Sequence, residues 1–273
     1  MLLQRVITAV VLLIAIGGAL FLAPPWVWGV LSLALLAGAG WEWAQLIGAR
    51  PGRIAGAIGA GGVAWLIWRE LGGAAGSWLA LGLVPILVIW TAVAVPSILG
   101  ARLRGAHPLL AVVSLLALWV ALHELRVVAP VLVLSAMAIV WCADIGAYFV
   151  GRAFGRRKLA PRVSPGKSWE GVWGGLATTI GVALAIAWVT GPSTEILSSR
   201  IAEQAGVAAM VAGLTALVAF SVVGDLYESL MKRSAGVKDS GRLLPGHGGI
   251  LDRIDALVPT MPMCLLLWMA LTR

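Results

Sequence analysis

Long apolar stretches are the feature of this sequence that most restricts its fold. Hydrophobic residues make up 60% of the 273-residue chain and charged residues 12%, whereas a soluble domain carries about 25% charged residues. A helix that crosses a membrane needs roughly 20 apolar residues. We therefore expect an all-α, polytopic integral membrane protein with about nine transmembrane helices. The candidate spans cover residues 6–22, 26–47, 54–68, 78–97, 109–122, 128–150, 171–190, 207–230 and 255–271.

The N-terminal stretch allows two interpretations. Arg5, followed by an apolar run to Ala23, resembles a signal peptide that is removed after export. Further apolar stretches follow at once, however, so a first anchor helix that ends before Pro24 is the favoured interpretation.

The distribution of basic residues predicts how the chain crosses the membrane. Cytoplasmic loops carry an excess of Lys and Arg, and with the N-terminus inside, 16 of the 20 Lys and Arg residues fall in inside segments. We expect the N-terminus and two charged loops, 151–170 and 231–254, on the cytoplasmic face and the C-terminus outside; in a bacterium this would be the inner or plasma membrane. The same bias accounts for the net charge of +8 without a nucleic-acid partner.

Polar side chains divide the chain into two regions. Residues 1–125 carry almost no polar chemistry and no functional motif, which predicts transmembrane helices for anchoring and packing. Residues 126–273 hold, in two polar segments, seven of the twelve acidic residues, and we expect this region to be catalytic. Acidic groups at membrane depth are costly and are therefore candidates for function. Cys142 and Cys264 lie in apolar stretches without metal-binding spacing and are interpreted as packing residues.

The more charged of the two segments begins at the end of the eighth span. Asp225, Glu228, Ser229 and Lys232 are spaced i, i+3, i+4 and i+7. On a helix this spacing places all four side chains on one polar face. A solvated loop with positive-inside charges would explain the basic residues here but not the acids, glycines and histidine among them.

Two further carboxylates, Asp252 and Asp255, are three residues apart at the start of the ninth span. Two helix ends would then bring acidic groups together at one level of the membrane. Mg²⁺ binds carboxylate oxygens and leaves room for substrate phosphates, so we expect a Mg²⁺ site here, which a second, monovalent cation could share. The predicted ligands are Asp225 and Asp252 first, with Asp255 and Glu228 as alternatives.

A glycine-rich turn lies between these helix ends. Gly246, Gly248 and Gly249 would let backbone N–H groups approach an anion without interference from a Cβ atom. His247, among them, is placed to donate to a phosphate oxygen. The surrounding cations suit several phosphate groups. They are Lys232, Arg233, Lys238, Arg242 and Arg253.

The second polar segment extends from Asp144 to Glu170. Asp144 and Tyr148 are four residues apart on one face of the sixth span, and an unpaired aspartate there would need a cation or a lysine nearby. Residues 166–168 imitate the end of a P-loop, but Pro161 occupies the position of its first glycine and no strand precedes it. We therefore reject a P-loop. A purely structural basic loop would leave Asp144 unexplained.

Both segments resemble one family, the CTP:phosphatidate cytidylyltransferases, or CDP-diacylglycerol synthases. Residues 144–171 are similar to that family's second polar region, and length and span number agree over the whole chain. The specific resemblance lies in the last half, in the pattern Ser229-x-x-Lys232-Arg233-x4-Lys238-Asp239-x-Gly241-x-x-Leu244-Pro245-x-His247-Gly248-Gly249-x-x-Asp252-Arg253-x-Asp255.

The resemblance implies an all-helical membrane enzyme that makes CDP-diacylglycerol and pyrophosphate from CTP and phosphatidate with Mg²⁺. We expect three kinds of catalytic residue: those that bind phosphates, one that closes the site from the 151–170 loop, and one that orients a neighbouring lysine. These are Lys167, Lys232, Arg233, Lys238, Asp239, His247 and Arg253. The residues expected to contact substrate are Asp144, Tyr148, Ser164, Glu170, Ser229, Gly246, Gly248 and Gly249.

Other functions remain as alternatives. A polyprenol kinase or another lipid-linked CTP-dependent transferase would use similar substrates, although a CDP-alcohol phosphotransferase should show an Asp-Gly-x-x-Ala-Arg motif that this sequence lacks. A transporter of a phosphorylated solute should show two repeated halves, and the halves here are unlike. The sequence leaves open whether the chain forms a homodimer.

Overall fold

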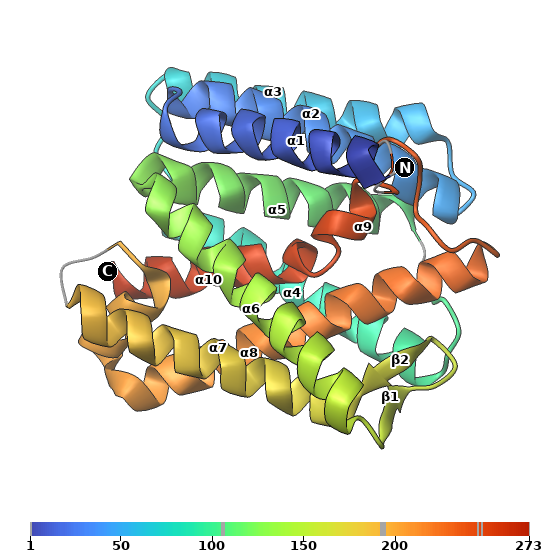
Figure 1. Ribbon diagram of the computed structural model, residues 1–273. Helices are drawn as coiled ribbons and strands as arrows, with labels where there is room; N and C mark the ends of the chain where they lie inside the picture. Colours follow the sequence, from blue (N-terminus) through green and yellow to red (C-terminus); the bar gives the residue numbers. More distant parts are fainter. Residues whose placement is uncertain (1, 105–106, 192–194, 245, 247, 273) are drawn as a thin grey trace.

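The computed structural model describes residues 2–104, 107–191, 195–244, 246 and 248–272. Over these residues the chain forms ten helices and one two-stranded hairpin (Figure 1). The elements are α1 (Leu2–Phe21), α2 (Pro25–Leu46), α3 (Pro51–Glu70), α4 (Ser77–Leu99), α5 (Pro108–Val128), α6 (Pro130–Phe154), β1 (Lys158–Ala160), β2 (Ser164–Ser168), α7 (Trp169–Thr190), α8 (Leu197–Ser234), α9 (Leu251–Ile254) and α10 (Leu257–Leu271).

Seven segments of the described chain are long and apolar enough to cross a membrane. They are α2, α4, α5, α6, α7, α8 and the α9–α10 pair taken together. α1 and α3, with 20 residues each, occupy the other two predicted spans. The prediction of an all-α polytopic membrane protein is therefore confirmed, and the expected number of spans is approximately right.

Prolines mark the start of four of these helices. Pro25, Pro51, Pro108 and Pro130 are the first residues of α2, α3, α5 and α6. Proline suits this position because the first N–H groups of a helix have no partner within it, and the ring already holds a helical φ. These residues therefore fix where each span begins.

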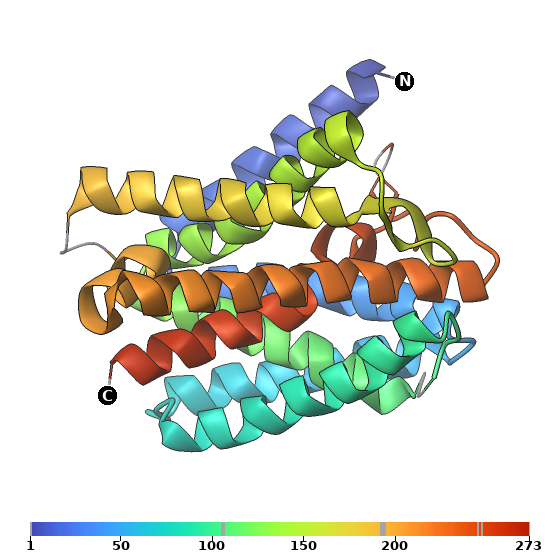
Figure 2. The same cartoon turned by 90° about the horizontal axis from the view of Figure 1, so that it is seen from below.

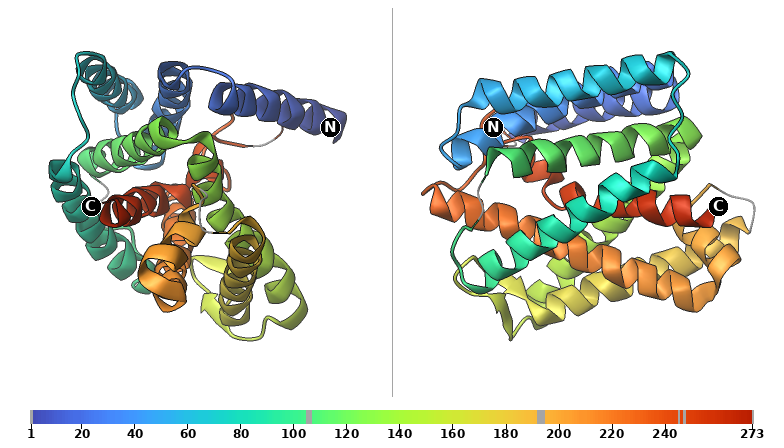
Figure 3. Two further views of the ribbon diagram at one scale, coloured as in Figure 1. Left: turned by 90° about the vertical axis from the view of Figure 1, so that its left-hand side faces the viewer. Right: turned by 180° about the vertical axis from the view of Figure 1, so that it is seen from behind.

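α5 is the central helix of the fold. Every residue from 117 to 126 is buried, so this part of the helix is enclosed on all sides. α2 and α3 pack on it, and α10 packs on it from the direction of α8 (Figures 1 and 3). α5 and α10 thus join the N-terminal helices to α6, α7 and α8.

The structure differs from the sequence prediction at two elements. The loop after α6 contains an antiparallel hairpin, in which Ala160 pairs with Ser164 and Lys158 with Ser168; its strands of three and five residues are too short to detect from periodicity. α8 begins at Leu197, well before the predicted span, and bends at Gly206, whose φ is +86°. Its first part is too polar to have been included by hydropathy.

The N-terminal half also contains more polar contacts than its sequence suggested. Arg69 Nε lies 3.2 Å from Glu124 Oε1, which also accepts a hydrogen bond from Trp65 Nε1 at 3.1 Å. Beside them, the His123 ring stacks on Trp119 with 5.5 Å between ring centroids. The expectation that residues 1–125 carry almost no polar chemistry was therefore wrong, because spans distant in sequence bring single polar residues together.

The two charged loops lie at the same end of the helical bundle. The start of α1, the ends of α2, α6 and α8, and the β1–β2 hairpin occupy this end, and the end of α10 lies at the opposite one (Figures 1 and 2). This arrangement agrees with the predicted grouping of the loops with the N-terminus. Which side of a membrane this end faces stays a prediction.

Glycines let α6 and α7 approach closely. A Cβ atom at Gly175 would lie 2.5 Å from the carbonyl oxygen of Ala143 on α6, and at Gly146 it would meet the side chain of Thr178 on α7. Small residues at such interfaces let the backbones of membrane helices touch. The close packing holds the part of α6 that carries Asp144 against α7.

We expect Gly175→Ala to lower the thermal stability of the protein in detergent, by about 1–3 kcal/mol for an overpacked contact. The added methyl group would meet a backbone carbonyl that cannot rotate away. Gly181→Ala is the control in the same helix, because a Cβ atom at Gly181 would have no neighbouring atom within 4 Å. Equal melting temperatures for the two variants would contradict this account of the packing.

Candidate active site

The end of α8 carries the predicted polar face. Ser229 Oγ donates to Asp225 Oδ1 over 3.4 Å, and Lys232 Nζ lies 2.5 Å from Glu228 Oε2. Glu228 is almost completely buried, so its charge would be costly without the ammonium group beside it. The prediction from helical spacing is therefore confirmed for these four side chains.

Asp252 connects α8 to the loop that follows it. Its Oδ1 accepts a hydrogen bond from Lys232 Nζ at 2.7 Å. Its Oδ2 accepts from the backbone N–H groups of Ser240 at 3.0 Å and Gly249 at 2.9 Å. One carboxylate thus holds both ends of the loop against α8, and both of its oxygens are engaged.

Glu42 of α2 is a site residue that no motif in the sequence singled out. It is only 1% exposed, and its Oε2 accepts from the backbone N–H of Leu251 at 2.9 Å and from Ser240 Oγ at 3.2 Å. A Cβ atom at Gly241 or Gly249 would collide with this carboxylate. An acidic residue inside the apolar stretch 26–47 was a signal that could have identified it.

The second polar segment reaches the same site through Lys167. The Lys167 ammonium of β2 forms an ion pair with Asp225 of α8. Asp144 of α6 lies close enough to interact electrostatically with both groups. All three line a cavity of about 530 Å³ between α6, α7 and α8. The expectation that a lysine should lie near Asp144 is therefore confirmed.

Asp255 adds a further carboxylate from the turn between α9 and α10. It interacts electrostatically with Asp225. The close approach depends on Gly224, because a Cβ atom there would lie 2.5 Å from the carbonyl oxygen of Asp255. α8 and the turn between α9 and α10 are thus held in backbone contact beside the two acidic groups.

The balance of charge at this site favours a cation. Five carboxylates surround two lysines: Asp144, Asp225, Glu228, Asp252 and Asp255 against Lys167 and Lys232. In the part of the chain that the structure describes, no three metal-ligating side chains converge on one point. Mg²⁺ commonly takes only one or two carboxylates and completes its coordination with substrate phosphates and water, so the donor set fits that ion.

The glycine-rich turn requires glycine at two positions. Gly246 and Gly248 have φ values of +76° and +85°, in the left-handed region that favours glycine. The N–H of Leu244 donates to the carbonyl oxygen of Gly248 at 3.0 Å, which closes the turn. His247 lies outside the described residues, so its predicted role stays a prediction.

Several other predicted residues lie around the site. Tyr148 accepts a hydrogen bond from Arg152 at 3.0 Å and lines the cavity with Asp144. Glu170 accepts from the backbone N–H groups of Arg156 and Arg157 and so holds the segment between α6 and β1 against the start of α7. Ser164 belongs to β2. Exposed positions are taken by Arg233, Lys238, Asp239 and Arg253.

Comparison with known proteins identifies the class. The cytidylyltransferase family matches residues 3–271, and the chain belongs to this family. It is 42% identical to a phosphatidate cytidylyltransferase from Pseudomonas aeruginosa, over 99% of this chain and 98% of that protein. It is 51% identical over 131 residues to a protein of the same name from Haemophilus influenzae, covering 48% of this chain and 43% of that protein. The resemblance inferred from the motif is confirmed.

We expect Glu42→Ala to reduce both stability and turnover. The substitution leaves the Leu251 N–H buried without a partner, at a cost of about 1–3 kcal/mol, and frees the loop that Asp252 also holds. Thermal unfolding and initial rates in detergent would measure the two effects. Glu70→Ala is the control, because Glu70 is exposed at the far end of α3. Wild-type stability and rate in Glu42→Ala would contradict the anchoring role.

Proposed function

We propose that this chain transfers the cytidylyl group of CTP to phosphatidate and releases CDP-diacylglycerol and pyrophosphate. The observation that carries the proposal is the meeting of both charged segments in one site, where Lys167 from the hairpin pairs with Asp225 of α8. The family match and the 42% identical relative support the reaction class and the substrates. The product would supply phospholipid synthesis.

The chemistry requires positioning and charge neutralisation. An oxygen of the phosphatidate phosphate forms a bond to the α-phosphorus of CTP while the bond from that phosphorus to the bridging β-phosphate oxygen breaks. The attacking phosphate is already ionised near neutral pH, so no side chain has to remove a proton. Lys167 and Lys232 approach the reacting phosphates from two elements and offset the charge that gathers there.

The cavity beside Lys167 suits the lipid substrate. Its walls include small or apolar residues from three membrane-spanning helices, such as Ala143, Gly175 and Val218. If Lys167 binds the phosphate of the lipid, its acyl chains would lie along these walls. The remaining basic residues would bind CTP and the departing pyrophosphate. They are Arg233, Lys238 and Arg253, with His247 as an additional donor.

We also propose that the reaction depends on Mg²⁺. Asp225 and Asp255 are the favoured ligands, because Asp225 is held only by the side chains of Ser229 and Lys167, which can turn away, whereas Asp252 is also fixed by two backbone N–H groups. The ion would neutralise charge on the phosphates of CTP. A second, monovalent cation beside the same carboxylates and a homodimeric assembly stay predictions.

The proposed site faces the cytoplasm. CTP is a charged solute of the cytosol, whereas phosphatidate lies in the bilayer. A site where helix ends meet a charged loop lets each substrate arrive from its own phase. The excess of Lys and Arg in the loops at this end supports the orientation.

A labelling experiment tests the reaction. With phosphatidate and Mg²⁺ present, label in the α-phosphate of CTP should enter the lipid extract, and label in the γ-phosphate should appear in pyrophosphate. A polyprenol kinase would give the opposite distribution, with the γ-label in the lipid. Absence of α-label from the lipid would overturn the proposed function.

A second experiment tests the metal requirement. Treatment with EDTA should remove activity and added Mg²⁺ should restore it. Asp225→Asn should raise the Mg²⁺ concentration for half-maximal activity at least about tenfold, corresponding to 1.4 kcal/mol of binding free energy. Glu203→Gln, an exposed position at the opposite end of α8, is the control. Full activity in EDTA would refute metal dependence without refuting cytidylyl transfer.

A further inference from the structure

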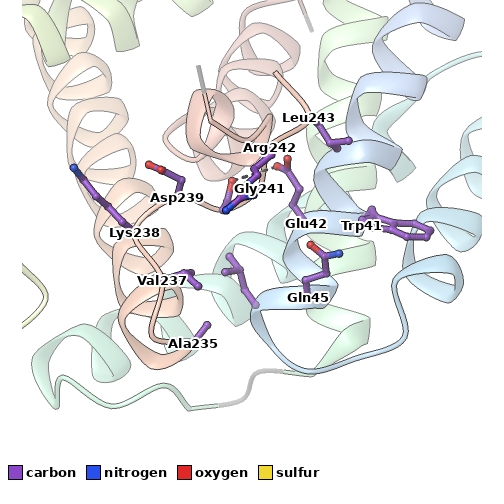
Figure 4. A pocket seen from close by; sticks show the side chains of 12 residues that line it. Trp41, Glu42, Gln45, Ala235, Val237, Lys238, Asp239, Gly241, Arg242 and Leu243 are labelled. Carbon is purple, nitrogen blue, oxygen red and sulfur yellow. Dashed lines mark hydrogen bonds between the residues drawn. The ribbon is translucent and has the colours of Figure 1, made fainter. Parts of the chain in front are cut away.

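A second polar cavity lies at the charged end of the molecule, apart from the one that contains Asp144 and Lys167. It has a volume of about 730 Å³ and lies between the end of α2 and residues 235–243, the segment that follows α8 (Figure 4). This volume is within the range of roughly 300–1,000 Å³ that is typical of small-molecule sites. The proposed lipid cavity and metal site leave this space unused.

The walls of this cavity differ in chemistry. Trp41 and Gln45 lie on the α2 wall (Figure 4). Lys238, Asp239 and Arg242 lie on the wall formed by the 235–243 segment. All five side chains are exposed. An amide on the α2 wall that can both donate and accept, and two cations on the 235–243 segment, suit a ligand with a heterocycle at one end and phosphates at the other.

The cavity is joined to the reacting centre by a short series of contacts. Ser240, in the cavity wall, donates its backbone N–H to Asp252 at 3.0 Å, and Asp252 accepts from Lys232 at 2.7 Å. Lys232 in turn pairs with Glu228 of α8. A ligand whose phosphates extend from the cavity along this wall would therefore bring them toward the carboxylates and lysines of the active site.

The position of Glu42 links the cavity to the N-terminal half of the chain. Glu42 lies behind Gly241 and holds Ser240 and Leu251 by hydrogen bonds. α2 supplies both Glu42, which holds the 235–243 segment through Ser240, and the exposed Gln45. The two walls of the cavity are therefore held at a fixed distance from each other. The two cavities then lie on different sides of the end of α8, one between α6, α7 and α8 and one beside α2.

We propose that the cavity beside α2 holds the cytidine end of CTP, with Gln45 hydrogen-bonded to the edge of the pyrimidine and Lys238 and Arg242 near the phosphates. The inference rests on the proposed function for its choice of nucleotide. It assigns nucleotide recognition to α2, in the half of the chain that the sequence indicated was for anchoring. The lipid and the nucleotide would then approach the reacting centre from opposite sides of α8.

Gln45→Leu tests the assignment through steady-state kinetics. Loss of one or two hydrogen bonds to the base should raise the KM for CTP about five- to tenfold, with the KM for phosphatidate unchanged within about twofold. Gln204→Leu, the same substitution at an exposed position near the opposite end of α8, should change neither. An unchanged KM for CTP, or a change confined to phosphatidate, would overturn the proposal.

Protection of an introduced thiol gives a readout that does not depend on turnover. In Gln45→Cys, saturating CTP or CMP should slow labelling by a maleimide at least about fivefold, whereas phosphatidate micelles should not. The unsubstituted protein measures labelling of Cys142 and Cys264, and Gln204→Cys is the matched control. A variant that forms labelled lipid from CTP but gains no protection from CTP would refute the location while leaving the function intact. Protection by CTP without labelled lipid would refute the function alone.

Discussion

The pairing of Lys232 with Glu228 and Asp252 is the interaction on which the site depends. Glu228 is buried, and Asp252 is fixed by two backbone N–H groups, so neither carboxylate can turn toward water to reduce its cost. The ammonium group between them, at 2.5 and 2.7 Å, offsets both charges. Removing it would leave uncompensated charge in a part-buried place, which is typically far more destabilising than an intact ion pair is stabilising.

This ion-pair arrangement explains why distant parts of the chain are needed. Asp252 can hold the glycine-rich loop only if the loop backbone comes close. Glu42 of α2 binds the same loop from the other side by accepting hydrogen bonds from Ser240 and Leu251. Glycine at 241 and 249 is required because any side chain there would occupy the space of the Glu42 carboxylate. α2 therefore supports the loop of the candidate site in addition to packing among the N-terminal helices.

The location of the site at one end of the bundle suits a reaction between a lipid and a soluble nucleotide. The Lys167–Asp225 pair lies at a cavity walled by spanning helices, and the second cavity lies beside exposed polar side chains of α2. Small residues such as Gly175 and Gly224 let the helices that carry the acidic groups approach to backbone contact. Packing in the apolar region thus sets the spacing of charges at its surface.

The sequence by itself determined the fold class, the polar face at Asp225 to Lys232, and the family. Each of these follows from local spacing or from composition, because an apolar stretch must satisfy its own backbone in lipid. Only the tertiary structure decided the role of Glu42, the pairing of Lys167 with Asp225, and the position of the cavity beside α2. These contacts join residues from about 60 to more than 200 positions apart, and no local pattern encodes which helices will meet.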